Sequence, residues 1–266
     1  MNTKNIVIIG TGNVAWHIAN SFAHHHYIRV VQVFNHHLSP KAKQFAKQFH
    51  LNLVTDYKKL DTTADVYLIA VKDEAIVDVA LQLKPLKLKG IVAHTSGSVD
   101  ISVLKATSTH IGVYYPLQTF YTGAEINWKE TPILLEANQT KGLHLLRTIA
   151  KTVSNYVHTL KSAERLTLHL AAVFANNFTN ALYAASYQIV ENTLTKKQTK
   201  LLNPIIQQSV VKLQKHHPLE AQTGPAKRHD KVTLQKHMAL IKHNPSLLKI
   251  YKTMTDLIVL QQAHKK

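Results

Sequence analysis

The stretch Asn5-Ile-Val-Ile-Ile-Gly-Thr-Gly-Asn-Val-Ala15 decides the fold of this chain. The apolar run up to Ile9 is typical of a strand that is buried on both faces. A glycine turn follows and opens a helix. The first glycine permits the tight turn, the second lets the backbone approach a pyrophosphate, and the small Ala15 lets helix and strand pack closely. The stretch therefore predicts a dinucleotide site made by Gly10, Thr11, Gly12, Asn13, Val14 and Ala15. A fold of this kind that binds no dinucleotide, or that binds FAD or an adenylate group, is the alternative.

The rest of the first half alternates between strand and helix patterns. Strands are expected at 28–34, 53–54, 65–71, 90–94, 111–114 and 132–136, and helices at 14–24, 40–50, 75–83 and 139–152. Such alternation predicts a parallel sheet with helices on both faces. From about Ala163 the chain reads as helix, over 163–192, 196–215, 232–243 and 246–264. The expected architecture is α/β: a doubly wound, Rossmann-like domain over residues 1–158, then an all-α domain over 159–266.

Composition narrows the class of protein. The chain has 266 residues and no cysteine, which excludes a disulfide framework and a thiolate zinc site and suits a reducing cytoplasm. The apolar run at the N-terminus is too short for a signal peptide, and no stretch is long and apolar enough to span a membrane. The paired histidines at 24–26, 36–37 and 216–217 lack nearby carboxylates and helical i, i+4 spacing, so no metal site is expected.

The formal net charge of +17 is the unusual bulk property. A nucleic-acid partner is one explanation, but the basic residues are scattered rather than clustered with aromatic residues. We expect no nucleic-acid partner and instead a positive field that attracts an anionic cofactor and a small anionic substrate.

The residues after the second strand bear on the choice of dinucleotide. NAD-binding proteins usually place an acidic residue about 20 positions after the glycine loop, where it accepts from the ribose 2′-OH. Here no acidic residue occurs before Asp56, and the strand ends at Asn35 and His36. Both side chains can bond a 2′-phosphate, and Lys41 could approach it. The sequence favours NADP, with NAD as the alternative.

Two later strands end in polar residues on the same edge of the predicted sheet. Ala70, Val71 and Lys72 follow the strand at 65–71 and should pass the nicotinamide ribose. His94, Thr95 and Ser96 end the next strand and offer groups that donate or accept protons. Residues 115–119 end the following one. A loop built only from turn-forming residues is the alternative for each segment.

The helix expected at 163–192 carries an unusual set of polar residues. On an ideal helical wheel Arg165, His169, Asn176, Asn180 and Tyr183 share one narrow band, with Asn177 further round. No charged residue occurs between Leu166 and Val190, so this polar stripe should be enclosed. A substrate site and an interhelical or dimer-interface amide network are both open. The segment 220–230 is a second polar island, read either as a site or as a loop in which Asp230 caps a helix.

Together these residues resemble a bacterial family of Rossmann-like oxidoreductases with a helical C-terminal domain of unknown function. The motifs are IIGTGNVAWHIA, IAVKDEAI, HTSGS, YYPLQTF, LHLAAVFANNFTNALY and EAQTGPAKRHD. The family is related to pyrroline-5-carboxylate reductases, prephenate dehydrogenases and 6-phosphogluconate-type β-hydroxyacid dehydrogenases. The resemblance implies NADP binding, oxidoreductase chemistry, dimerisation through the helical domain, and one cleft lined by HTSGS and the NNFTN stripe. In the hydroxyacid dehydrogenases this helix carries a lysine, which is missing here.

The predicted function is NADP-dependent reduction of a small carbonyl or imine substrate in an interdomain cleft. Asn176 and Asn180 would hold the substrate, and His169, His94 or Ser96 would handle the proton, since imidazole titrates near neutral pH. The alternative is a non-catalytic NADP(H)-binding sensor or a dimeric interaction protein.

Overall fold

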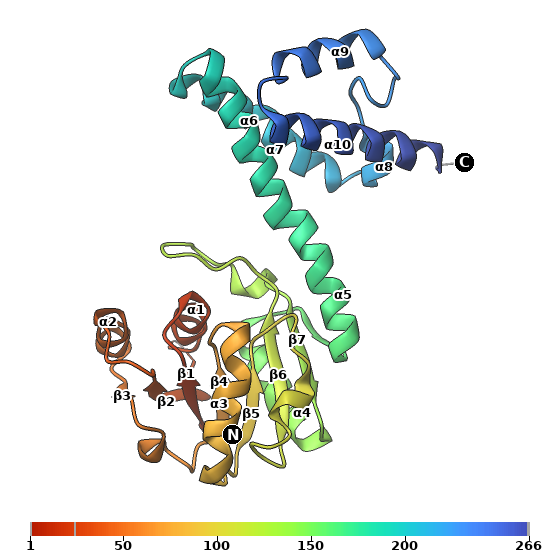
Figure 1. Cartoon of the computed structure of the whole chain (residues 1–266). Coiled ribbons are helices and arrows are strands. Elements are labelled where there is room, and N and C mark those ends of the chain that lie inside the picture. Colours follow the sequence, from red (N-terminus) through yellow and green to blue (C-terminus); the bar gives the residue numbers. More distant parts are fainter. Residues whose placement is uncertain (1, 24, 265–266) are drawn as a thin grey trace. The chain divides into compact units, whose positions relative to one another are not determined.

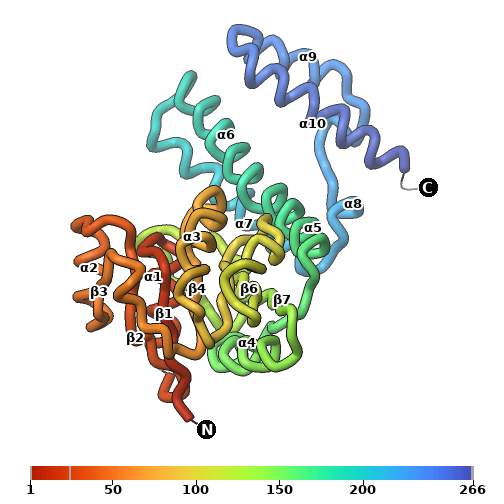
Figure 2. Tube along the Cα trace, turned by 60° about the horizontal axis from the view of Figure 1, so that its bottom comes forward, coloured from red at the N-terminus to blue at the C-terminus, as the bar shows by residue number. Residues whose placement is uncertain are grey.

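The structure is a computed structural model that describes residues 2–23 and 25–264. The described residues form two compact units: residues 2–173 except 24, and residues 174–264. The boundary expected after residue 158 lies inside the short strand β8 (Val157–Thr159). The first helix beyond it still packs on the sheet, so the first unit extends further along the chain. Figure 1 shows the elements and Figure 2 follows the same chain as a trace.

The first unit is built on one sheet. Across the described residues the strand order is β3-β2-β1-β4-β5-β6-β7-β8. The strands are β1 (Lys4–Ile9), β2 (Ile28–Phe34), β3 (Asn52–Val54), β4 (Val66–Ile69), β5 (Ile91–His94), β6 (Ile111–Pro116), β7 (Ile133–Ala137) and β8. The doubly wound sheet predicted from the sequence is confirmed for β1 to β6, which are all parallel. The expectation of a wholly parallel sheet is wrong at one point, because β7 runs antiparallel to β6.

Helices cover both faces of this sheet. They are α1 (Asn13–Phe22), α2 (Pro40–Gln48), α3 (Ile76–Leu83) and α4 (Thr140–Val153). Along β1, Ile6 and Ile8 belong to the core under α1, α2 and α4, whereas Val7 and Ile9 belong to the core under α3. This alternation explains the continuous apolar run, since both faces of the strand are buried. The helix expected at 14–24 would end at His24, which lies outside the described residues.

The second half is helical, as predicted. The α-helices are α5 (Ser162–Ala172), α6 (Thr179–Thr193), α7 (Asn203–Leu213), α8 (Pro218–Ala221), α9 (Lys231–Leu240) and α10 (Pro245–Ala263). A π-helical segment, Val173–Phe178, lies between α5 and α6. The region expected as one kinked helix or two over 196–215 is a 3-10 segment, Lys196–Leu202, followed by α7 with Pro204 in its first turn, where a missing N–H costs nothing.

No helix within the described residues is long and apolar enough to cross a membrane. Likewise, the described residues contain no group of three or more His, Asp or Glu side chains that could hold a metal ion.

Candidate functional site

The glycine loop lies where β1 meets α1 and touches the end of β4. Gly10 has a φ of +113°, and a Cβ there would come within 2.3 Å of the Ala70 carbonyl oxygen, so only glycine fits. Gly12 precedes α1, and a Cβ there would meet nothing within 4 Å. No side chain caps the start of α1 and no acidic residue lies in its first turn. The first N–H groups of the helix are therefore free to bind an anion, and the loop fits a dinucleotide pyrophosphate.

The end of β2 adjoins this loop. The Thr11 hydroxyl donates to Asn35 Oδ1 at 3.0 Å, and Asn35 Nδ2 donates to the His37 carbonyl at 2.7 Å. His36 is exposed. Gly10, Asn35, His36 and Val71 line one cavity of about 790 Å³, which is large enough for part of a dinucleotide.

Two acidic residues, Asp56 and Asp78, also line this cavity. Asp56 is occupied as the cap of a short 3-10 turn, where its carboxylate accepts from the Lys58 N–H at 2.9 Å. Lys41 lies on another side of the glycine loop, where its Nζ donates to Asn13 Oδ1 at 3.4 Å. At the end of β2, the exposed His36 and the second N–H of the Asn35 amide are the groups that remain available to a 2′-phosphate.

The loop after β5 is held by its own side chains. The Thr95 N–H and hydroxyl both donate to the Ile69 carbonyl, at 3.1 and 3.3 Å, which joins the ends of β4 and β5. The Ser96 hydroxyl accepts from the N–H groups of Ser98 and Val99, each at 3.1 Å. Ser96 is buried and shapes this turn, so its hydroxyl is less suited to moving a proton than the sequence suggested.

His94 is wholly buried beneath that loop. Its Nδ1 accepts from the Ser96 N–H at 3.2 Å, and its Nε2 has no partner among the described residues. Burial, followed by the nearby positive charge of Arg165, lowers the pKa of His94 to about 4. The imidazole is therefore neutral at neutral pH, where it serves the packing of the loop better than proton exchange.

The loops after β4 and β5 are also linked directly. The Ser98 hydroxyl donates to the Asp73 carboxylate at 2.6 Å. Lys72, next in the chain to Asp73, is largely exposed and pairs with Glu74 at 3.7 Å. The backbone at 70–71, rather than the Lys72 side chain, is thus the part of this segment that borders the glycine loop.

Tyr115 and His169 form a pair at this edge of the sheet. The Tyr115 hydroxyl lies 3.0 Å from His169 Nδ1, and the two rings meet edge to face. Both pack on the loop after β5, since a Cβ at Gly97 would come within 2.6 Å of His169 Nδ1 and 2.8 Å of Tyr115 Cζ. Burial, reinforced by the negative charge of Asp73, raises the pKa of Tyr115 to about 12. The phenol is therefore protonated at neutral pH.

A buried ion pair places His169 beside Tyr115. Arg165, on α5, is 1% exposed, and its guanidinium bonds the Glu136 carboxylate of β7 and the Val99 carbonyl. The Ser162 hydroxyl donates to the same carboxylate at 2.7 Å and accepts from the Ile101 N–H at 3.1 Å. These bonds fix α5 against β7 and the 99–101 segment, so His169, one turn after Arg165, reaches the loop.

The amides expected to complete the site lie in the second unit. Asn176, Asn177 and Asn180 are all exposed in the single chain, whereas Arg165, at the start of the same stripe, is 1% exposed, so enclosure of the asparagines stays a prediction. The ideal helical wheel also does not apply across the π segment Val173–Phe178. A π turn holds one residue more than an α turn and so rotates the later residues around the helix by up to roughly 100°. Asn180 lines a cavity of about 510 Å³ with Tyr183, Tyr187 and Asn203. Their role in a substrate site stays a prediction.

The second polar island, residues 220–230, contains the helix cap expected from the sequence. Asp230 caps α9, with Oδ1 accepting from the Thr233 N–H at 3.1 Å and Oδ2 accepting from the Thr233 hydroxyl at 2.7 Å. Lys227 donates to the Gln222 carbonyl at 2.7 Å and so closes the preceding turn. The N-cap expected from the sequence is confirmed.

The comparisons with known proteins define the class first. Residues 5–97 match the family model described as NADP oxidoreductase, coenzyme F420-dependent, and residues 131–258 match a domain of unknown function, DUF2520. With the glycine loop on a doubly wound sheet, these matches make the chain an NAD(P)-dependent oxidoreductase. The sequence matches no curated protein.

A solved relative then fixes the family. BF3122 from Bacteroides fragilis, an assigned NADP oxidoreductase, is 31% identical, with 97% of this chain and 98% of that chain covered and a TM-score of 0.88. The chain belongs to this family of NADP oxidoreductases with a helical C-terminal domain, and its cofactor is NADP.

More distant structures share the fold. TM1727 from Thermotoga maritima is 20% identical over 97% of this chain and 99% of that chain, with a TM-score of 0.79. The 1-pyrroline-5-carboxylate reductase of Streptococcus pyogenes is 16% identical over 99% of this chain and 100% of that chain, with a TM-score of 0.61. The kinship with pyrroline-5-carboxylate reductases expected from the motifs is therefore confirmed at the level of the fold.

Proposed function

We propose that the protein is an NADP-dependent reductase of a small carbonyl or imine compound, in which Tyr115 and His169 supply the proton. The observation that carries this proposal is the 3.0 Å contact between the Tyr115 hydroxyl and His169 Nδ1. The pair packs on the same loop that Thr95 joins to the end of β4, beside the glycine loop. The proton-transfer groups and the dinucleotide loop thus share one edge of the sheet.

Three groups of residues at this edge of the sheet would bind different parts of NADP. Gly10, Gly12 and the first turn of α1 would bind the pyrophosphate, and Asn35 and His36 would face the 2′-phosphate. Ala70, Val71 and Thr95 would border the nicotinamide ribose. When bound, NADPH supplies the hydride for the reduction.

The protein must supply the proton that balances the hydride. Reduction of a C=O or C=N bond places a hydride on carbon and leaves an electron pair on oxygen or nitrogen, which needs one proton. Because the pKa of Tyr115 is about 12, its hydroxyl keeps its proton at neutral pH until the more basic oxygen or nitrogen develops. His169 can then pass its Nδ1 proton to the phenolate through their shared hydrogen bond, while Nε2 takes up a proton from solvent.

Two observations support the substrate class. Imine Reductase from Myxococcus stipitatus, in complex with NADP+, and Reductive Aminase from Aspergillus terreus, in complex with NADPH, have this fold, with TM-scores of 0.64 and 0.65 at 15% identity each. The net charge of +17 favours an anionic substrate. Asn176 and Asn180 remain the proposed contacts for its carbonyl or carboxylate.

Association of two chains through the helical region belongs to the same proposal. Leu170, Phe174 and Phe178 are each at least half exposed in the single chain. Exposed large apolar side chains are typical of protein–protein interfaces, and a second copy of the chain is the proposed partner. A cytoplasmic location stays a prediction from the sequence.

The test combines NADPH binding with a substrate panel of 2-keto acids, 3-keto acids and cyclic imines. We expect NADPH to bind and at least one class to be reduced, and His169→Gln to lower turnover and shift its pH profile without weakening NADPH binding. Tight NADPH binding with no turnover across the panel would overturn the proposal.

NADPH binding without turnover would favour a non-catalytic NADP(H)-binding sensor or a dimeric interaction protein. One observation speaks for it: no lysine occurs between Leu166 and Val190, where related hydroxyacid dehydrogenases carry one. Asn180→Ala separates the two functions, because an enzyme would lose turnover, whereas an interaction protein would lose self-association and keep NADPH binding.

A further inference from the structure

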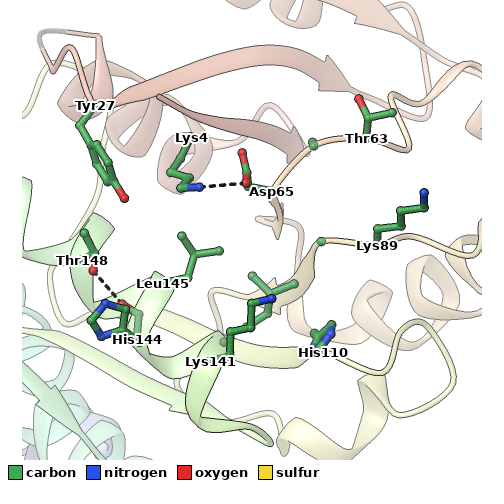
Figure 3. A pocket seen from close by; sticks show the side chains of 14 residues that line it. Lys4, Tyr27, Thr63, Asp65, Lys89, His110, Lys141, His144, Leu145 and Thr148 are labelled. Atoms are coloured by element: carbon green, nitrogen blue, oxygen red, sulfur yellow. Dashed lines mark hydrogen bonds and ion pairs between the residues drawn. The ribbon is translucent and has the colours of Figure 1, made fainter. Parts of the chain in front are cut away.

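A further cavity lies at the edge of the sheet opposite the glycine loop. It has a volume of about 590 Å³ and borders the residues at which parallel strands begin: Lys4 in β1, Asp65 before β4, Gly90 before β5 and His110 before β6. The start of α4, at Lys141 and Gly142, closes another side. Figure 3 shows Lys4, Asp65, His110 and Lys141 around the cavity. The size is within the range of small-molecule sites, about 300–1,000 Å³.

Positive charge dominates this cavity. Its lining includes three lysines (Lys4, Lys89 and Lys141) against the one carboxylate of Asp65, together with His110 and His144. That carboxylate is already used: one oxygen lies 3.3 Å from Lys4 Nζ and the other accepts from the Asn5 N–H at 2.9 Å. Neither Lys89 nor Lys141 forms an ion pair within the described part of the chain. The cavity therefore holds two cations with no counter-charge.

The start of α4 adds to the positive electrostatic potential in this cavity. This helix has 14 residues, no side-chain cap at Gln139 and no acidic residue in its first turn. A helix N-terminus carries a partial positive charge, so a lysine there is unfavourable unless an anion offsets it. Lys141 lies in that first turn. Helix and side chain thus both favour a negative group in the adjoining cavity.

Part of the cavity wall is apolar. Tyr27, Ile91 and Leu145 contribute to the lining. Gly142 lets α4 approach β5, since a Cβ there would lie 2.8 Å from Ile91 Cδ1. The wall can therefore cover the non-polar body of a ligand whose charged end meets the lysines.

We propose that this cavity binds a small multivalent anion, carrying a phosphate or clustered carboxylates, as a site separate from the NADP site. β1 runs from Lys4 at this cavity to Ile9 beside Gly10, six residues or about 20 Å of extended chain. A ligand here would leave the glycine loop free, so both sites can be filled at once.

The experiment measures anion binding by calorimetry on the whole protein saturated with NADPH, which blocks the first site. The probes are inorganic pyrophosphate and citrate, so that phosphate and carboxylate ligands are distinguished. The test variant is Lys89→Gln/Lys141→Gln. Its control is Lys151→Gln/Lys249→Gln, which removes the same charge from exposed lysines outside the cavity.

We expect saturable binding of at least one probe, weakened about tenfold or more in the test variant, because one hydrogen bond to a charged group contributes about that factor. The control should bind within about twofold of wild type, since distant charges are screened. The tighter probe identifies phosphate or carboxylate as the recognised group. No saturable binding of either probe, or equal weakening in the control, overturns the proposal.

Discussion

Gly97→Ala is the substitution that isolates the Tyr115–His169 pair most cleanly. The added Cβ would stand 2.6 Å from His169 Nδ1 and 2.8 Å from Tyr115 Cζ, whereas ordinary carbon contacts begin near 3.5 Å. Relief of the clash requires a movement of about 1 Å in one or both rings. Overpacking of this kind costs about 1–3 kcal/mol of folding free energy.

The effect on catalysis should be larger than the effect on folding. A misplacement of about 1 Å in groups that must meet the substrate can cost about 10²-fold in rate. We therefore expect kcat to fall about 100-fold while the protein stays folded and NADPH binding changes little, because Gly97 does not line the cavity beside the glycine loop. The assay follows NADPH consumption with the best substrate of the panel, alongside thermal unfolding and an NADPH titration.

Gly123→Ala is the matched control for this experiment. Gly123 has a φ of +84° and no atom within 4 Å of an added Cβ, so alanine there strains the backbone without touching the pair. A folded Gly97→Ala protein with kcat within twofold of wild type, or a control that loses as much activity, would refute the reasoning.

Three further predictions concern the frame around the site. Gly10→Ala should abolish NADPH binding and lower the free energy of unfolding by more than about 1 kcal/mol, because the new Cβ would meet the Ala70 carbonyl at 2.3 Å; fluorescence titration and denaturant unfolding report the two effects. Arg165→Leu should cost roughly 3–5 kcal/mol in denaturant unfolding, since it leaves Glu136 without its buried partner. His94 has a pKa of about 4 in the folded protein against the ordinary histidine value of 6.5, so the unfolded chain takes up its proton first as the pH falls. The neutral, buried His94 therefore contributes roughly 3 kcal/mol to the free energy of unfolding above pH 6.5, and this contribution is lost as the pH falls from 6.5 to 4. In His94→Gln the free energy of unfolding should depend less steeply on pH over that interval, by the slope that corresponds to about one proton.

The fold was predictable from the sequence in the first half of the chain, where the pattern of apolar residues agrees with the burial of the strands and helices. β1, the glycine turn and α1 were predictable because an apolar run with Gly10 and Gly12 admits few other conformations. The reversal at β7 was not predictable, since Ile133–Ala137 is an apolar run whose direction depends on pairing with β6 rather than on its own residues. The Asp230 cap was predictable because it is local.

The candidate site was only partly predictable. His169 and residues 115–119 were each recognised as polar positions, but their contact depends on the Arg165–Glu136 bond, which joins residues 29 positions apart. Gly97 gave no signal as a packing position, because its role lies in the space that it leaves for two side chains distant in the sequence. The π segment at Val173–Phe178 could not be read from an ideal helical wheel, so the Asn176 and Asn180 stripe was overstated.

Single-turnover NADPH oxidation, with enzyme in excess over cofactor and substrate saturating, tests the central claim most directly. The comparison is wild type, Tyr115→Phe and Tyr156→Phe, the last removing a hydroxyl from a tyrosine that is 51% exposed and apart from the pair. If Tyr115 gives the proton, its removal should slow the observed rate by about 10²–10⁴-fold, with wild-type behaviour in the control. Equal rates for Tyr115→Phe and wild type would contradict the account.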